Sequence, residues 1–179
     1  MKNLIFLGLV GLVLLFPSCS SDDNASPQNG FNYNGSFYET KDLYLNYVDD
    51  SALGSSISVI MVNKDLIESC ESSNLNYVLM QFATNSPDVV LEEVTYSDDE
   101  YDFFDYVVFN DGSLDSSCDI IDAKMILFDA MDDFWASPIS LTINTFNDNN
   151  IDLSFSFTRE DGAVINGNYS GSYTDVSDL

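Results

Sequence analysis

From residue 30 onward, apolar and polar side chains alternate in short runs that are separated by turn-forming residues. Residues 55–62 (SSISVIMV) and 151–158 (IDLSFSFT) are typical, because every second side chain is apolar. A period of two places these side chains on one face of a β-strand. Many such strands at close spacing predict an all-β fold, an antiparallel sandwich or barrel of roughly nine strands with room for one short helix.

The boundaries of the strands are marked by Gly, Asn, Asp and Pro residues. We expect strands at residues 31–33, 36–38, 42–48, 55–62, 75–84, 89–96, 101–109, 139–146, 151–158 and 163–174. Residues 75–84 (LNYVLMQFAT) differ from the others because they are apolar on both faces. Residues 64–74 are compatible with a short helix or a loop. Residues 120–135 are compatible with a helix or, as the neighbouring strands favour, with a strand at 123–128 and an acidic loop.

Residues that favour turns, and glycines within the expected strands, predict further local features. Asn34-Gly35 predicts a type I′ hairpin turn, since both central residues of that turn need positive φ angles. Residues 110–112 (NDG) predict a turn at the end of a strand. Gly167 and Gly171 fall on the same face of one predicted strand. Glycines in a strand indicate a bulge or a close approach, made here either by a packed aromatic ring or by a ligand groove.

The N-terminus has the features of an export signal. Lys2 precedes an uncharged apolar run at residues 4–16, which is shorter than the roughly 20 apolar residues that span a membrane. Ser18-Cys19 follows and resembles a lipobox, whose cysteine becomes lipidated; an ordinary secretory signal is the alternative. The expected organisation is residues 1–18 as a signal peptide, residues 19–30 as lipidated Cys19 with a flexible tether, and residues 31–179 as a single β-rich domain.

The sequence after Cys19 refines this expectation. Residues 20–24 (SSDDN) resemble the acidic export signal of surface lipoproteins from Bacteroidota. Residues 151–173 also look like the closing hairpin of small β-rich lipoproteins of that group, most of which have no assigned function. The resemblance implies a β-rich protein anchored in the outer membrane and facing the cell exterior, with an inward-facing anchor as the alternative. It implies no catalytic residues.

The charge of the chain excludes several kinds of partner. The formal net charge is −25, and loss of Lys2 with the leader leaves four basic residues against 30 acidic ones. Nucleic acid is excluded as a partner because phosphate binding needs clustered Lys and Arg. The expected membrane contact is through the lipid anchor alone. Aromatic residues make up 13% of the chain, so we expect a folded domain with an acidic, solvated exterior.

The sequence lacks several residue types and motifs that common catalytic sites require. Histidine is absent, which excludes Ser-His-Asp and Cys-His catalysis, His-ligated zinc and His general bases. A Gly-rich phosphate loop and a dinucleotide fingerprint are absent as well. A carboxylate pair that hydrolyses a glycosidic bond remains compatible with the sequence. With 30 acidic residues, however, some pair falls at a suitable separation by chance.

Clusters of carboxylates leave calcium binding open, although no cofactor is expected. Calcium takes six to eight oxygen ligands, which Asp-rich loops supply. A solvated acidic surface is the alternative explanation. The candidate metal ligands are Asp98, Asp99, Glu100, Asp102, Asp105, Asp111, Asp115 and Asp119.

Two thiols remain once Cys19 is lipidated. Cys70 and Cys118 lie in Ser-rich, acidic segments of a chain that is expected to be exported. An even number of cysteines in an oxidising compartment predicts a Cys70–Cys118 disulfide. Thiolate catalysis is disfavoured because no histidine is present to activate either sulfur.

Three functions fit these observations. The first is a non-catalytic binding or adhesion domain on a surface lipoprotein, with a glycan, a protein or a cation as the ligand. The second is a carboxylate-based extracellular glycoside hydrolase. The third is a structural envelope protein without a ligand. A cleft that holds two carboxylates about 5 to 10 Å apart distinguishes the second from the first.

Overall fold

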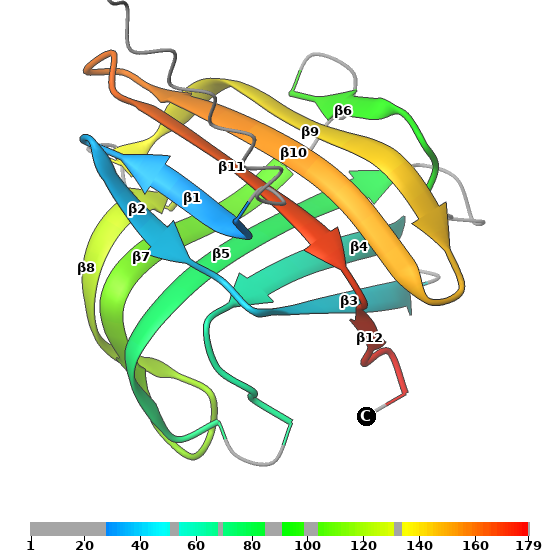
Figure 1. The fold of residues 1–179 in the computed structure, drawn as a ribbon, viewed down its shortest axis with the longest axis horizontal. Coiled ribbons are helices and arrows are strands. Elements are labelled where there is room, and N and C mark those ends of the chain that lie inside the picture. The colour runs from blue at the N-terminus through cyan, green and yellow to red at the C-terminus, as the bar shows by residue number, and fades with distance from the viewer. Residues whose placement is uncertain are drawn as a thin grey trace, which may run out of the picture.

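The computed structural model of the chain describes residues 28–50, 54–67, 70–84, 91–98, 104–130 and 134–178. The predicted lipidation site Cys19, the predicted signal peptide and most of the predicted tether lie outside these ranges. β-Strands in two sheets make up most of the described residues (Figure 1). None of these residues belongs to a helix long and apolar enough to cross a membrane.

The first sheet has six antiparallel strands. In spatial order they are β2 (Ser36–Glu39), β1 (Gly30–Tyr33), β11 (Val164–Gly171), β10 (Asn150–Arg159), β9 (Ala136–Asn147) and β6 (Thr95–Ser97). Strand β1 of the N-terminal hairpin pairs with β11, with Phe31 opposite Gly167. Strands from early and late in the sequence therefore lie side by side in this sheet.

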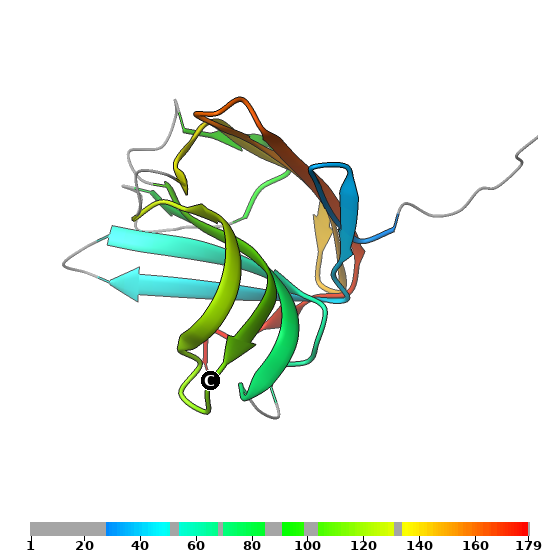
Figure 2. The same cartoon turned by 90° about the vertical axis from the view of Figure 1, so that its left-hand side faces the viewer.

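The second sheet also has six strands. In spatial order they are β12 (Thr174–Asp175), β3 (Asp42–Asp50), β4 (Gly54–Val62), β5 (Ser72–Thr84), β7 (Phe104–Leu114) and β8 (Ile120–Phe128). All neighbours are antiparallel except β12, which runs parallel to β3. Figure 2 shows the two sheets as separate, packed layers. The prediction of an all-β fold is confirmed, and of its two forms the sandwich is correct.

The core lies between the sheets and is filled by the inward-facing residues of both. Phe31 and Phe157 from the first sheet and Tyr106 from the second are at most 1% exposed. Burial of each such side chain contributes about 1.5 to 3 kcal/mol. The Tyr106 hydroxyl accepts a hydrogen bond from the Ala136 amide at 2.7 Å. This bond joins β7 of one sheet to the start of β9 in the other.

Two local predictions are confirmed. Asn34 and Gly35 have φ angles of 48° and 76°, as the type I′ turn between β1 and β2 requires. Gly167 lies beneath an aromatic ring, since a Cβ atom there would be 2.4 Å from Cζ of Phe155. A packed aromatic, and not a ligand groove, therefore accounts for this glycine.

The structure corrects the turn predicted at residues 110–112. β7 continues through these residues to Leu114 with shifts of register against β5 and β8, and Asp111 has a φ angle of 49°. The turn-forming residues are accommodated by β-bulges, which bend a strand without ending it. At Gly112 a Cβ atom would be 2.1 Å from the Phe109 ring. The glycine is thus needed for packing.

Other boundaries differ as well. Residues 120–128 form strand β8, as the surrounding strands favoured, but it begins three residues before the predicted start. Residues 64–67 are not helical, and residues 72–74 belong to β5. Of the strand expected at residues 89–96, residues 91–94 are irregular and only 95–97 form β6.

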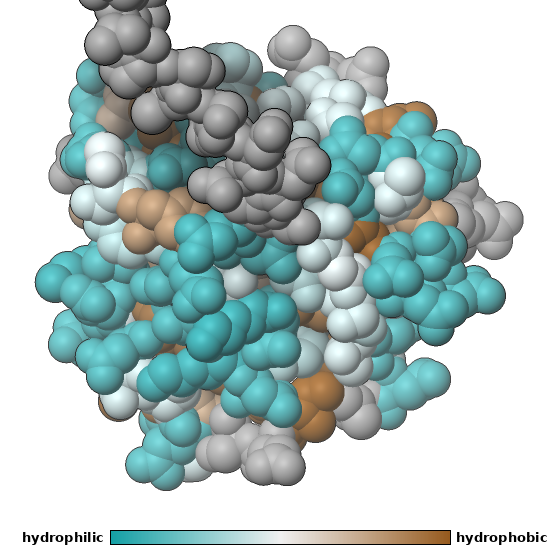
Figure 3. Space-filling model, in the orientation of Figure 1, coloured by the Kyte–Doolittle hydropathy of each residue, from teal (hydrophilic) through white to brown (hydrophobic). Residues whose placement is uncertain are grey.

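The outer faces of the two sheets differ in polarity. On the first sheet, short uncharged side chains lie side by side across four strands: Asn32, Asn166, Ser156 and Ser140. In the orientation of Figure 1 the surface is mostly hydrophilic (Figure 3). Part of the outer face of the second sheet carries apolar side chains instead, although a solvent-facing sheet surface is normally polar.

Candidate apolar binding pocket

The part of the second sheet next to the disulfide is apolar on both faces, and strand β5 shows this most clearly. Val78 and Met80 are fully buried in the core between the sheets. Tyr77 and Leu79 alternate with them and face outward, against the buried side chain of Phe109 on β7. The Tyr77 and Phe109 rings are stacked with their centroids 4.9 Å apart. A second apolar cluster therefore lies on the outside of the sandwich.

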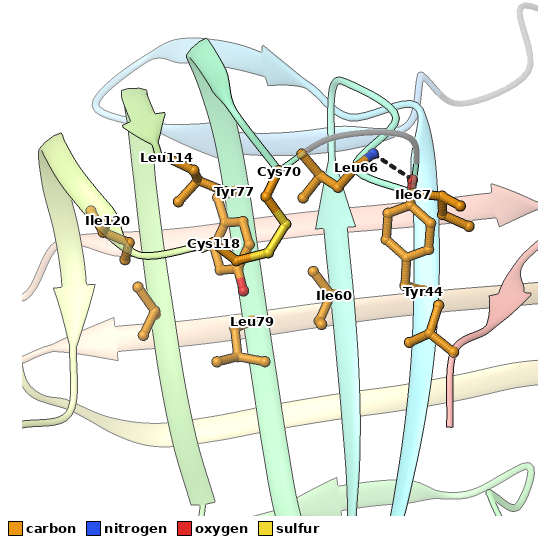
Figure 4. Close-up of a pocket in the computed structure, with 12 residues that line it drawn as sticks. Tyr44, Ile60, Leu66, Ile67, Cys70, Tyr77, Leu79, Leu114, Cys118 and Ile120 are labelled. Carbon is orange, nitrogen blue, oxygen red and sulfur yellow. Dashed lines mark hydrogen bonds between the residues drawn. A yellow bond between two sulfur atoms is a disulfide. The ribbon is translucent and has the colours of Figure 1, made fainter. Parts of the chain in front are cut away.

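A pocket of about 480 Å³ opens on this outer face. Its floor consists of side chains from four adjacent strands: Tyr44 of β3, Ile60 of β4, Tyr77 and Leu79 of β5 and Val107 of β7. Figure 4 looks onto these strands, with β7 and β8 on the left and β3 on the right. The pocket exists because outward-facing positions on neighbouring strands all carry apolar residues.

The Cys70–Cys118 disulfide forms one wall of the pocket. Both cysteines line it, and their Cα atoms are 5.0 Å apart (Figure 4). The predicted disulfide is thereby confirmed. The bond joins the segment before β5 to the loop between β7 and β8. That loop is shaped by Asp115, whose carboxylate accepts hydrogen bonds from the amides of Ser117 at 2.8 Å and Asp119 at 3.1 Å.

The Tyr77 hydroxyl is the polar group in the middle of the pocket. It lies near Cys118 and Leu79 in Figure 4 and forms no hydrogen bond with the described residues. Burial raises the pKa of Tyr77 to about 12, so its hydroxyl stays protonated at neutral pH. A protonated phenol both donates and accepts hydrogen bonds. Tyr77 can therefore orient a bound molecule through one polar contact.

A second polar group lies at the β3 side of the pocket. The Tyr44 hydroxyl donates a hydrogen bond to Oδ1 of Asp65 at 3.0 Å and accepts one from the Leu66 amide at 3.0 Å. Burial raises the pKa of Tyr44 to about 12. The Ile67 amide also donates to Oδ1 of Asp65, at 2.8 Å. These bonds fix the segment after β4 against the wall of the pocket.

The arrangement is suited to binding. Ligand sites are typically clefts of about 300 to 1,000 Å³, lined by apolar and aromatic side chains with a few polar groups. This pocket has that size and composition. Its lining, within the described part of the chain, contains no carboxylate, amine or free thiol that would act as a base or nucleophile.

The predicted acidic ligands are not gathered in the described residues. Asp98 accepts hydrogen bonds from Oγ of Ser137 at 2.9 Å and from the Ile139 amide at 3.2 Å. Asp111 forms an ion pair with Lys124 at 2.5 Å. No three Asp, Glu, Cys or His side chains among the residues described form a group that could hold a metal ion. Asp99, Glu100 and Asp102 lie outside those residues, so calcium binding stays a prediction.

One carboxyl pair does occur. Burial, together with a hydrogen bond and repulsion from Asp129, raises the pKa of Asp105 to about 7. A direct hydrogen bond between the two groups requires that they share a proton. The glycoside hydrolase stays a prediction.

No family model, curated protein or solved structure matches this chain. Apart from Cys70 and Cys118, the residues that form the pocket were not singled out in the sequence. The signal that could have found them is the pattern of residues 75–84, which are apolar on both faces of the strand. Other residues have to cover the apolar face of such a strand that points away from the core. The segment that carries Leu66, Ile67 and Cys70 supplies part of that cover.

Proposed function

We propose that this chain is a lipid-anchored lipoprotein of the outer membrane, facing the cell exterior, whose β-sandwich is a non-catalytic binding module for a small apolar ligand. The apolar leader and Cys19 support the anchor. The pocket on the outer face of the second sheet is the observation that supports the binding module. The proposal for the module does not depend on the anchor, because every residue that lines the pocket comes well after Cys19 in the sequence.

The physical reason is the cost of exposing apolar surface. Each Å² of apolar surface removed from water contributes roughly 25 cal/mol. Ile60, Tyr77 and Leu79 keep part of their surface uncovered on a strongly acidic protein, where polar side chains would be compatible with a β-strand. A ligand that fills the pocket covers this surface without any change of fold. Because the strands and the disulfide already hold the walls in place, little ordering opposes binding.

A neutral apolar dye tests this proposal. N-phenyl-1-naphthylamine should bind the non-lipidated Cys19→Ala chain saturably, with one site per molecule, and its fluorescence should rise on binding. Leu79→Trp should reduce the affinity at least tenfold, because the larger side chain fills the pocket from the outer face of β5. Fluorescence titration, with the melting temperature as a check of folding, measures both.

The matched control is Val164→Trp, which adds the same ring to an exposed position on the first sheet. It should leave the affinity for the dye unchanged. Absence of saturable binding to the unmodified pocket, or equal binding to the Leu79→Trp variant, would contradict the proposal and favour a structural envelope protein without a ligand.

A further inference from the structure

We propose that the pocket selects ligands in which an apolar body carries a positively charged head group, and that it discriminates against anionic amphiphiles. This inference rests on the proposed binding function and names the class of ligand. It follows from the carboxylate that is hydrogen-bonded to Tyr44 beside the pocket, and not from the apolar lining.

The head-group position is at Asp65. Tyr44 lines the pocket, and its hydroxyl is 3.0 Å from Oδ1 of Asp65, so the carboxylate lies one hydrogen bond from the apolar chamber. Both hydrogen bonds that Asp65 accepts within the described chain use Oδ1. Oδ2 is therefore available for a ligand cation. An ammonium group there would form a charge-assisted hydrogen bond.

The surroundings of Asp65 are acidic. Asp65 and Glu71 line a second hollow that adjoins the pocket at Leu114. Lys64 is the one basic residue in that lining, and its ammonium group donates to the carbonyl of Ser73. The pKa of Asp42 is raised, first by burial and then by the charge of Asp65, so these two carboxylates are close enough to repel each other.

The apolar tail has a place beside this charge. Ile67 and Ile120 line the pocket and are 50% and 44% exposed. Apolar side chains that remain exposed at the rim of a pocket extend its contact with a ligand. A molecule with its tail on the floor and its charge at Asp65 satisfies both regions. An anionic head group in the same position would face Asp65 on a chain with a net charge of −25.

Three ten-carbon probes of different charge test the inference. Decylammonium, decanol and decanoate, each below its micelle concentration, should displace N-phenyl-1-naphthylamine from the Cys19→Ala chain at pH 7.5. At low salt we expect decylammonium to bind at least tenfold more tightly than decanoate, equivalent to about 1.4 kcal/mol, with decanol between them. At 0.5 M salt the ratio should fall, because salt screens the electrostatic interaction between the probes and the acidic residues.

The variant Asp65→Asn keeps the Oδ1 acceptor for Tyr44 and removes the charge. It should lower the ratio of decylammonium to decanoate affinity to about threefold or less while leaving decanol affinity unchanged, which also shows that the pocket is intact. The control Asp148→Asn removes one charge from an exposed turn between β9 and β10 and should leave the ratio unchanged.

The outcomes separate this inference from the proposed function. Decanoate that binds as tightly as decylammonium would overturn the charge selectivity and leave the apolar pocket standing. A tenfold ratio that survives Asp65→Asn would place the cation elsewhere and would likewise overturn it. If none of the three probes displaces the dye, or if the dye does not bind, the binding function itself fails.

Discussion

At the scale of single residues, the carboxyl of Asp105 shows how strongly position alters chemistry on this acidic chain. Its pKa is raised to about 7 because the carboxyl is partly buried, and because Asp129 forms a hydrogen bond with it and repels its charge. Other carboxyls of similar sequence context are used structurally, as Asp98 is by Ser137 and Ile139. Acidity in the sequence therefore does not identify which carboxyl is perturbed.

The raised pKa of Asp105 predicts a pH dependence of stability. The folded state binds the proton more tightly than the unfolded state, so the stabilisation is fully present below the ordinary pKa of about 4 and is lost as the pH rises through 7. Asp105→Asn removes this contribution. The fall in free energy of unfolding between pH 4.5 and pH 8 should be smaller in the variant than in the wild type, measured by urea denaturation.

Other carboxylates also titrate in this range, so the comparison needs a reference. Asp148→Asn, at an exposed turn, should leave the pH profile parallel to that of the wild type. A profile of Asp105→Asn that is also parallel would show that the Asp105–Asp129 contact does not influence folding. Because Asp105 is partly exposed, solvent screening reduces the size of the effect.

At the scale of elements, the second sheet combines a core face with a binding face. β5 contributes Val78 and Met80 to one and Tyr77 and Leu79 to the other. The disulfide ties the segment before this strand to the loop before β8. It thereby holds the loop segments in the wall of the pocket against the strands of its floor.

Removal of the disulfide should affect stability and binding together. Cys70 and Cys118 are separated by 48 positions, and closing a loop of this length contributes about 4 kcal/mol in the chain-entropy model. A variant with both cysteines changed to Ser should lose stability of this order in urea denaturation. It should also bind N-phenyl-1-naphthylamine several-fold more weakly, although its far-UV spectrum stays β-like. Unchanged dye affinity would show that the disulfide does not shape the pocket.

At the scale of the whole molecule, the charge bears on the proposed anchoring. A net charge of −25 keeps molecules apart and repels anionic surfaces, so the proposed contact with a membrane depends on the lipid proposed at Cys19. Each buried methylene contributes about 0.8 kcal/mol, and two or three acyl chains hold a protein on a membrane stably. The proposed function therefore assigns attachment to one residue and recognition to the sandwich.

Substitution of Cys19 tests the proposed anchor. Cys19→Ala should move the protein from the membrane fraction to the soluble fraction, because no acyl chain is attached. Mass spectrometry of the mature wild type should show acylation at Cys19. The variant Cys70→Ala is the control, since it removes a different cysteine and should leave the protein in the membrane fraction. A mature N-terminus at another residue, without lipid, would refute the anchor.

The strand content, the first hairpin and the disulfide were predicted from the sequence alone. Each depends on short-range information: a period of two, the positive φ angles that Asn34-Gly35 adopts, and an even number of thiols. The prediction failed at residues 110–112 because the same turn-forming residues also fit a bulge. Whether a turn or a bulge is formed depends on whether β5 and β8 continue to pair with β7.

The tertiary structure alone decided where the site is. Tyr44, Ile60 and Tyr77 come from three separate strands, and only the pairing of β3, β4 and β5 brings them together. The alternation along one strand shows that a face is apolar, but not what covers it. That depends on the order of the strands and on the segments that cross them. These are set by contacts between residues far apart in the chain, which a local pattern does not encode.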